Sequence, residues 1–177
     1  REPIKCLHRA HLFWLTRVDQ TDDLALLEKF LHALQPEAGI IQSTYRPTRL
    51  RSLETGAEAD LSVLQGARTV MVCGIANPAS FERTLLELGA DLMERFSFPD
   101  HHPFKASEMR EVQNAAATKG AKLIVTTEKD GVRIPRDIQY KVPVYELNIE
   151  VHIIQGKEFL EKALWNRTSM QSCPKRN

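Results

Sequence analysis

Short apolar runs alternate along the chain with apolar residues at helical spacing. Residues 12–18 form an apolar run typical of a buried strand. An N-cap sequence at residues 21–23 precedes leucines that recur at helical spacing over residues 24–34. A second strand is expected to begin at Gly39, whereas residues 45–66 show little periodicity and predict a loop with a short helix or hairpin.

The same unit of strand and helix repeats through the rest of the chain. A β-branched run at residues 68–73 predicts an interior strand, and Asn77 with Pro78 then begins a helix. Further strands and helices are expected at residues 91–98, 107–119, 122–126, 142–149 and 156–165. Strands separated by helices predict an α/β fold with a mostly parallel sheet, flanked by helices and joined by right-handed crossovers.

The composition is that of an ordinary globular protein of 177 residues. Lys and Arg number 24 against 23 Asp and Glu, so the formal net charge is +1. A chain without a basic excess is not expected to bind nucleic acid through its phosphates. Three well-separated cysteines without a Cys-x-x-Cys pair argue against a disulfide framework or a zinc site. No apolar run approaches the roughly 18–20 residues that a transmembrane helix needs.

Three loops that directly follow expected strands hold the candidate chemistry. They comprise residues 74–78, 98–103 and 126–130. In a parallel sheet the carboxyl ends of the strands lie at one edge, and ligands bind there. We therefore expect these three loops to converge on one site.

The first two loops each fit a functional and a structural interpretation. Residues 74–78 place free backbone N–H groups at a helix start, which suits an anion but also describes a well-capped helix without a ligand. In the second loop Asp100 precedes His101 and His102 between two prolines. A carboxylate beside an imidazole orients its tautomer and favours proton transfer near neutral pH. The alternative is a polar surface turn.

The third loop and a basic segment also each fit two interpretations. Lys129 suits contact with a phosphate and Thr127 contact with a hydroxyl, although the acids of this loop also fit a plain surface. Residues 45–51 contain three arginines, which suit an acidic head group or a solvated face. The chain has no G-x-x-x-x-G-K-[ST] sequence, so it carries no P-loop and, by itself, no complete catalytic set.

Several short motifs occur in an order and spacing that resemble one protein family. They are Arg1-Glu2-Pro3, Tyr45-Arg46-Pro47-Thr48, Cys73-Gly74-Ile75-Ala76-Asn77-Pro78, Phe98-Pro99-Asp100-His101-His102 and Thr126-Thr127-Glu128-Lys129-Asp130. Together they resemble the C-terminal half of the bacterial tetraacyldisaccharide 4'-kinases. The resemblance extends to about Leu164, and we expect one α/β lobe over residues 1–168 with a polar tail over 169–177.

The resemblance implies a step in lipid A synthesis at the cytoplasmic face of the bacterial inner membrane. The family transfers the γ-phosphate of ATP, with Mg²⁺, to the 4'-hydroxyl of a tetraacyldisaccharide 1-phosphate. Its fold is similar to that of P-loop kinases, with a second Rossmann-like lobe that closes the cleft. The implied partners are therefore the lipid substrate, the N-terminal P-loop lobe and, peripherally, the membrane surface. The fragment alone is expected to be inactive.

The resemblance also implies roles for individual residues. Asp100 and His101 match the catalytic loop of the second lobe, where the histidine acts with a carboxylate of the other lobe that activates the sugar hydroxyl. Glu2 matches the glutamate of the family's Arg-Glu-Pro segment and is expected near Mg²⁺ or nucleotide. The other matching positions, with binding roles for substrate or nucleotide, are Asn77, Lys129 and Asp130.

Two alternatives come from other classes of function. The Asp100-His101-His102 sequence suggests a metal-dependent phosphoesterase, which would need further aspartates to hold a metal pair. A non-catalytic binding module is the second alternative.

Overall fold

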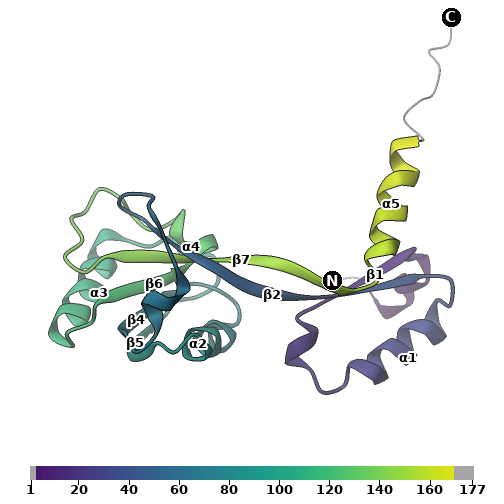
Figure 1. The fold of residues 1–177 in the computed structure, drawn as a ribbon, viewed down its shortest axis with the longest axis horizontal. Helices are drawn as coiled ribbons and strands as arrows, with labels where there is room; N and C mark the ends of the chain where they lie inside the picture. Colours follow the sequence, from purple (N-terminus) through teal and green to yellow (C-terminus); the bar gives the residue numbers. More distant parts are fainter. Residues whose placement is uncertain (1–2, 170–177) are drawn as a thin grey trace, which may run out of the picture. The chain divides into compact units, whose positions relative to one another are not determined.

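The computed structural model describes residues 3–169, with side chains described up to Leu164. The chain divides into two compact units. Unit 1 comprises residues 1–46 and 151–177, and unit 2 comprises residues 47–150. Within the range expected to form one lobe, the structure thus has two units, and two strands run from one into the other (Figure 1).

Unit 2 is built on a parallel sheet in the order β7-β6-β4-β5. Its strands are β4 (Arg68–Cys73), β5 (Asp91–Ser97), β6 (Leu123–Thr127) and the first part of β7 (Val144–Gln155). The β-branched and apolar runs of β4 and β6 are buried on both faces, as interior parallel strands require. The prediction of an α/β fold with a mostly parallel sheet is confirmed.

Two helices cover opposite faces of the unit 2 sheet (Figure 1). Helix α3 (Ala106–Thr118) packs its buried side chains on Val70, Val72 and Ile124. Helix α2 (Pro78–Glu87) packs on Met71 and Val125. Because side chains of a strand alternate between faces, consecutive residues of β4 belong to different cores. The alternation of apolar residues along β4 and β6 therefore provides core contacts for both helices.

Two strands are longer than the sequence predicted. Strand β2 (Gly39–Ser52) continues into the first part of the segment expected to be a loop, and β7 continues to Gln155. Leu53 N donates to Val144 O at 2.9 Å, and Thr48 Oγ1 donates to Asn148 O at 3.4 Å, so β2 and β7 run antiparallel. Backbone pairing between these strands satisfies their polar groups without a regular apolar pattern, which is why periodicity did not reveal them.

The end of β2 also makes the hairpin expected in this segment. Strand β3 (Glu58–Ala59) pairs antiparallel with β2, and the 3₁₀ helix η3 (Leu61–Leu64) then leads to β4.

Unit 1 contains the other part of the same sheet, made of β1 (Leu12–Thr16), which is parallel to β2, the beginning of β2 and the end of β7. Its helices are α1 (Leu24–Leu34), α5 (Lys157–Ser169) and the 3₁₀ helices η1 (Ile4–Arg9) and η2 (Val18–Gln20). Phe13 of β1, Leu31 of α1 and Ile40 of β2 form its small core. No helix among the described residues is both long enough and apolar enough to span a bilayer.

Candidate active-site loops

The connections of unit 2 reverse direction between β4 and β6. From β4 the chain passes through α2 to β5 on one side, and from β5 it returns through α3 to β6 on the other side. The chain leaves β4 toward β5 and leaves β6 toward β7, so the loops after β4 and β6 depart in opposite directions at the carboxyl edge of the sheet. This is the position at which open α/β sheets bind ligands.

The three loops expected to converge do meet at this edge. Gly74 N, after β4, donates to Asp130 Oδ2 at 2.9 Å. Gly74 O accepts from His101 N at 3.2 Å, and Lys129 Nζ lies 3.5 Å from Asp100 Oδ1. Backbone and side-chain bonds thus connect each loop to the next, and their predicted convergence is confirmed.

Asp130 lies at the centre of these connections and is fully buried. It belongs to the short helix α4 (Glu128–Gly131), which begins where β6 ends. Its Oδ2 accepts from Gly74 N and from Thr127 Oγ1 at 2.8 Å, while its Oδ1 pairs with Arg133 Nη2 at 2.6 Å. Both carboxylate oxygens are therefore engaged within the protein. Asp130 therefore holds the loops after β4 and β6 together, and we call this residue with its bonds the latch. The binding role expected for it stays a prediction.

Arg133 extends the latch to the second loop. Its Nη1 donates to the carbonyl oxygen of His102 at 3.3 Å. One guanidinium thus links the helix after β6 to the loop after β5, and the planar donor set of arginine suits this arrangement. Sequence reasoning missed Arg133, although its position three residues after Asp130 is the spacing of an ion pair along a helical turn.

His101 is presented to solvent on a fixed backbone. Its side chain is 71% exposed, and its φ of 63° lies in the left-handed region. Histidine is among the residues that enter this region more readily than most, and such backbone positions gather at functional sites. Its Nε2 lies 3.6 Å from Asp100 Oδ2, and its backbone N donates to Asp100 Oδ1 at 3.0 Å. The loop therefore holds an accessible imidazole beside a carboxylate.

Lys129 adds a positive charge to this pair. Its side chain is 55% exposed, and its ammonium lies 3.5 Å from Asp100 Oδ1. Asp100 thus stands between an imidazole and an ammonium group. An exposed ion pair of this kind contributes little stability, so the ammonium remains free to contact an anion.

His102 has the opposite environment from His101. Its ring stacks on Phe98 with centroids 4.6 Å apart and meets Phe104 edge-on at 5.3 Å. His102 Nε2 lies 2.9 Å from Glu108 Oε2, and only 17% of the His102 side chain is exposed. The structure therefore makes His102 an anchor of the loop and leaves His101 as its accessible histidine.

Glu108 connects the His102 ring to the start of α3. Its Oε2 also accepts from Lys105 N at 2.8 Å, which caps the start of α3. The bond from the Lys105 backbone, together with that from His102, holds the pKa of the Glu108 carboxyl below its usual range. The signal in the sequence was a glutamate in the first turn of an expected helix, which is typical of a capping box.

The Asn77 side chain caps the start of α2. Its Oδ1 accepts from Ser80 N at 3.1 Å, and Pro78 follows at the first helical position. The sequence-based prediction of a capped helix start is therefore confirmed. A role of Asn77 in binding substrate or nucleotide stays a prediction. Glu2 lies outside the described residues, as do residues 170–177 of the expected tail.

The basic segment of β2 is largely paired with acids. Arg49 Nε lies 2.9 Å from Glu58 Oε1, and Arg51 binds Glu146 Oε1 through both Nε at 2.7 Å and Nη2 at 2.5 Å. Glu146 is fully buried, and its Oε2 lies so close to Gly131 of α4 that a methyl group there would overlap it. Sequence reasoning missed this pair of a partly exposed arginine and a buried glutamate, because its members are 95 residues apart.

Metal binding finds no support in the side chains that the structure describes. They contain no group of three or more His, Cys, Asp or Glu residues that would hold an ion. Asp100 and His101 are neighbours without the additional aspartates that a metal pair needs. Among the described residues, the phosphoesterase alternative therefore finds no further ligands for a metal pair.

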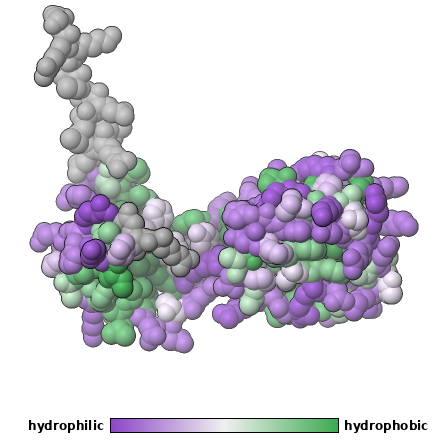
Figure 2. Space-filling model, turned by 180° about the vertical axis from the view of Figure 1, so that it is seen from behind, coloured by the Kyte–Doolittle hydropathy of each residue, from purple (hydrophilic) through white to green (hydrophobic). Residues whose placement is uncertain are grey.

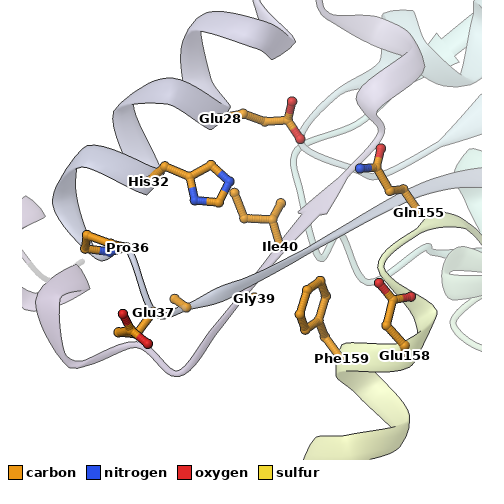
Figure 3. A pocket seen from close by; sticks show the side chains of 10 residues that line it. Glu28, His32, Pro36, Glu37, Gly39, Ile40, Gln155, Glu158 and Phe159 are labelled. Atoms are coloured by element: carbon orange, nitrogen blue, oxygen red, sulfur yellow. The ribbon is translucent and has the colours of Figure 1, made fainter.

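A hollow of about 470 Å³ lies elsewhere, between α1, α5 and the beginning of β2 in unit 1 (Figure 3). Glu28, Glu37 and Glu158 line it together with His32 and Phe159. It is next to Gly39, at the amino end of β2, whereas α/β sheets bind ligands at the carboxyl ends of strands. Three carboxylates also make it a poor site for a phosphate.

The reactivity of Cys73, at the end of β4, tests whether a thiol reagent can enter the interior of unit 2. Burial raises the pKa of its thiol to about 11, so at pH 8 only about one thiol in a thousand is ionised. In the native chain we expect iodoacetamide to alkylate the half-buried Cys6 and to leave Cys73 unmodified. Peptide mass spectrometry after timed alkylation measures this. Equal alkylation rates at Cys6 and Cys73 in the native chain would contradict this prediction. In urea, both of these cysteines should react.

With this geometry established, comparison with known proteins identifies the family. Residues 1–169 match the family described as tetraacyldisaccharide-1-P 4'-kinase, also called LpxK. This chain belongs to that family. A tetraacyldisaccharide 4'-kinase of Anaeromyxobacter sp. (strain Fw109-5) is 36% identical over 167 residues, and the match covers 93% of this chain and 44% of the relative. The corresponding kinase of Halothermothrix orenii is 30% identical, with 86% of this chain and 44% of the relative covered.

A solved LpxK structure has the same fold. The crystal structure of the protein from Aquifex aeolicus, in complex with ATP, matches with a TM-score of 0.58 at 21% identity. The match covers 94% of this chain and 45% of that one. The LpxK-family chain described here thus spans a little under half the length of the relatives that it matches.

Proposed function

We propose that this chain contributes the second half of a tetraacyldisaccharide 4'-kinase. The reaction would transfer the γ-phosphate of ATP to the 4'-hydroxyl of tetraacyldisaccharide 1-phosphate, a step of lipid A biosynthesis. Membership of the family and the arrangement of the three loops support this proposal.

The observation that carries the proposal is the exposed His101 imidazole on a loop that is latched to two others. Asp100 lies beside it, and the two residues contact the loops after β4 and β6, between which the connections of the sheet change direction. A phosphoryl acceptor must be oriented and must lose its proton, and positioning with charge stabilisation supplies most of the catalysis. His101 would contact the 4'-hydroxyl and act with a carboxylate of the P-loop lobe, which activates that hydroxyl as the oxygen approaches the γ-phosphate. Asp100 would orient the imidazole.

Lys129 and the loop after β4 fit the phosphate groups of such a reaction. The Lys129 ammonium is exposed beside Asp100, and the start of α2 lies on the same edge of the sheet. Either feature would bind a phosphate of the nucleotide or of the lipid substrate. The expected binding roles of Asn77, Lys129 and Asp130 belong to this proposal.

ATP and Mg²⁺ would be held mainly by the part of a full-length kinase that this chain does not span. The described residues contain no P-loop and no carboxylate cluster for Mg²⁺, and Asp130 and Glu146 are already paired with arginines. They therefore do not fit a resident metal by themselves. Glu2 remains the position proposed near Mg²⁺ or nucleotide.

The lipid substrate places the proposed enzyme at the cytoplasmic face of the bacterial inner membrane, with peripheral contact between protein and membrane. No nucleic-acid partner is proposed, since the net charge is +1.

The proposed function is tested by transfer of labelled phosphate from [γ-³²P]ATP to tetraacyldisaccharide 1-phosphate in detergent micelles. We expect none from this chain alone and transfer when it is fused to the unmatched part of the Anaeromyxobacter sp. Fw109-5 kinase. That kinase in its intact form sets the reference rate. A correctly folded fusion that binds both substrates and transfers no phosphate would contradict the proposal.

A further inference from the structure

The interior of unit 2 changes from apolar to polar on the α3 side of its sheet, close to the carboxyl edge. Ile124 and Val144 pair across β6 and β7 and belong to the core under α3. Two residues further along each strand, on the same face, Thr126 pairs with Glu146. Figure 2 shows mostly hydrophilic side chains over the visible face of unit 2, whereas Glu146 is fully buried. Burying a carboxylate is unfavourable unless it is paired, so its place in the interior requires a physical reason.

Only one of the two carboxylate oxygens of Glu146 is paired. Arg51 binds Oε1 through Nε at 2.7 Å and Nη2 at 2.5 Å, whereas Oε2 has no hydrogen-bond partner among the described residues. Thr126 Oγ1, on the adjacent strand, makes no hydrogen bond to it either. A buried ion pair is often no more stabilising than apolar residues of the same volume. Pairing with Arg51 therefore does not by itself explain a glutamate at this position.

The unpaired oxygen lies against the backbone of α4. Gly131 is the last residue of this short helix, and a side chain there would overlap Glu146 Oε2. Gly131 is not among the glycines with positive φ, so its backbone conformation suits alanine, which favours a helix more than glycine does. The need for glycine thus comes from the carboxylate and not from the backbone.

Both sides of this contact are held in place. Arg51 fixes Oε1 of Glu146, so the carboxylate does not turn away freely. Asp130, the residue before Gly131, is fixed by its bond from Gly74 N at 2.9 Å. Helix α4 is therefore held between the latch on one side and the Glu146 carboxylate on the other.

We propose that Glu146 is a positioning residue for the loop after β6. Its carboxylate, oriented by Arg51, sets how closely α4 approaches the sheet. It thereby sets the position of Asp130 in the latch and of Lys129 beside Asp100. Glu146 itself contacts neither substrate nor nucleotide in this proposal, which rests on the proposed function only for the reaction that the loop serves.

The first test uses this chain alone and requires no catalysis. Gly131→Ala is expected to lower the urea midpoint of unfolding by about 1 M, because the added methyl group overlaps the carboxylate. In a chain that already carries Glu146→Ala, the same substitution should change the midpoint little. The next nearest atoms, Leu53 Cδ2 and Glu146 Cβ, would be 3.2 and 3.3 Å from the new methyl group, and small shifts relieve such contacts. An equal loss in both backgrounds would overturn the proposal.

Hydrogen exchange measured by NMR locates the effect within the chain. In Glu146→Ala, the Gly74 amide, which donates to Asp130, should exchange about tenfold faster or more. The buried Ile124 amide, which donates to Pro143 O at 2.9 Å, reports global opening and should change less. Glu146→Gln keeps the shape and an acceptor for Arg51, so it should restore the protection of Gly74. Unchanged exchange at Gly74, or equal acceleration at Ile124, would contradict a positioning role.

Kinetics of the fusion to the unmatched part of the Anaeromyxobacter sp. Fw109-5 kinase test the consequence for catalysis. Glu146→Ala is expected to lower kcat by about 10²-fold, as a misplacement of about 1 Å does, with little change in KM for ATP. Glu146→Gln should restore most of kcat. Full turnover in the Glu146→Ala fusion would overturn the proposal.

Arg51 and Arg49 provide the matched pair of variants for the same assay. Arg51→Gln should lower kcat because it releases the buried Glu146 carboxylate, whereas Arg49→Gln only breaks a pair with the exposed Glu58 and should leave kcat unchanged. Equal effects of the two variants would count against Glu146. A fusion that transfers no phosphate even when unmodified would contradict the proposed function. The alanine variants and hydrogen exchange would then still decide whether Glu146 positions the loop.

Discussion

Replacing His101 with asparagine in the complete kinase is expected to lower kcat by about 10²–10⁴-fold, the usual contribution of a general acid or base. Asparagine also tolerates the left-handed backbone that His101 adopts, so the loop should keep its shape. Because the His101 side chain is 71% exposed, the free energy of unfolding should change by no more than about 0.5 kcal/mol. Steady-state kinetics and urea unfolding measure the two quantities.

The neighbouring histidine provides the comparison. His102→Asn removes a ring that packs between Phe98 and Phe104 and lies 2.9 Å from Glu108. We expect this variant to lower the stability of the loop more than His101→Asn does. If His101→Asn kept full turnover while His102→Asn lost it in a folded protein, the roles of the two histidines would have to be exchanged.

Replacing Asp130 with alanine is expected to lower the free energy of unfolding of this chain by about 3–5 kcal/mol. The carboxylate is fully buried, and its removal leaves Gly74 N without its acceptor and the Arg133 guanidinium without its partner. A half-buried charge without its counter-ion costs more than the bond itself contributes. Urea unfolding followed by circular dichroism measures the change.

Asp130→Asn and Glu128→Gln are the matched variants for this prediction. Asparagine keeps an oxygen for Gly74 but loses the charge that pairs with Arg133, so its loss of stability should be intermediate. Glu128 is exposed in the same short helix, and its substitution should be nearly neutral. Equal stability of Asp130→Ala and the unmodified chain would show that Asp130 is not a latch.

The sequence predicted the position of the candidate site because that position follows from the order of the elements. Loops after parallel strands share one edge of a sheet, and residues 74–78, 98–103 and 126–130 meet there. Sequence reasoning could not determine which role each residue has within the site. The order Asp100-His101-His102 does not indicate which histidine stacks on Phe98, since that depends on where β5 and α3 place the ring.

Pairs that are distant in the sequence were not predictable for the same reason. Asp130 contacts Gly74, 56 residues away, and Glu146 contacts Arg51, 95 residues away. Nothing in a local pattern distinguishes a buried acid from a surface acid when its partner comes from another element.

By itself the sequence determined the α/β class, the interior strands, the capped helices and the edge at which the loops converge. These follow from periodicity and chain order, which are local properties. The tertiary structure alone decided that β2 and β7 extend between two units, that Asp130 is buried while His101 is exposed, and that β1 stands at an open edge. Burial and pairing depend on neighbours distant in the sequence, so an apolar run such as residues 12–15 indicates that a strand needs cover without indicating what covers it.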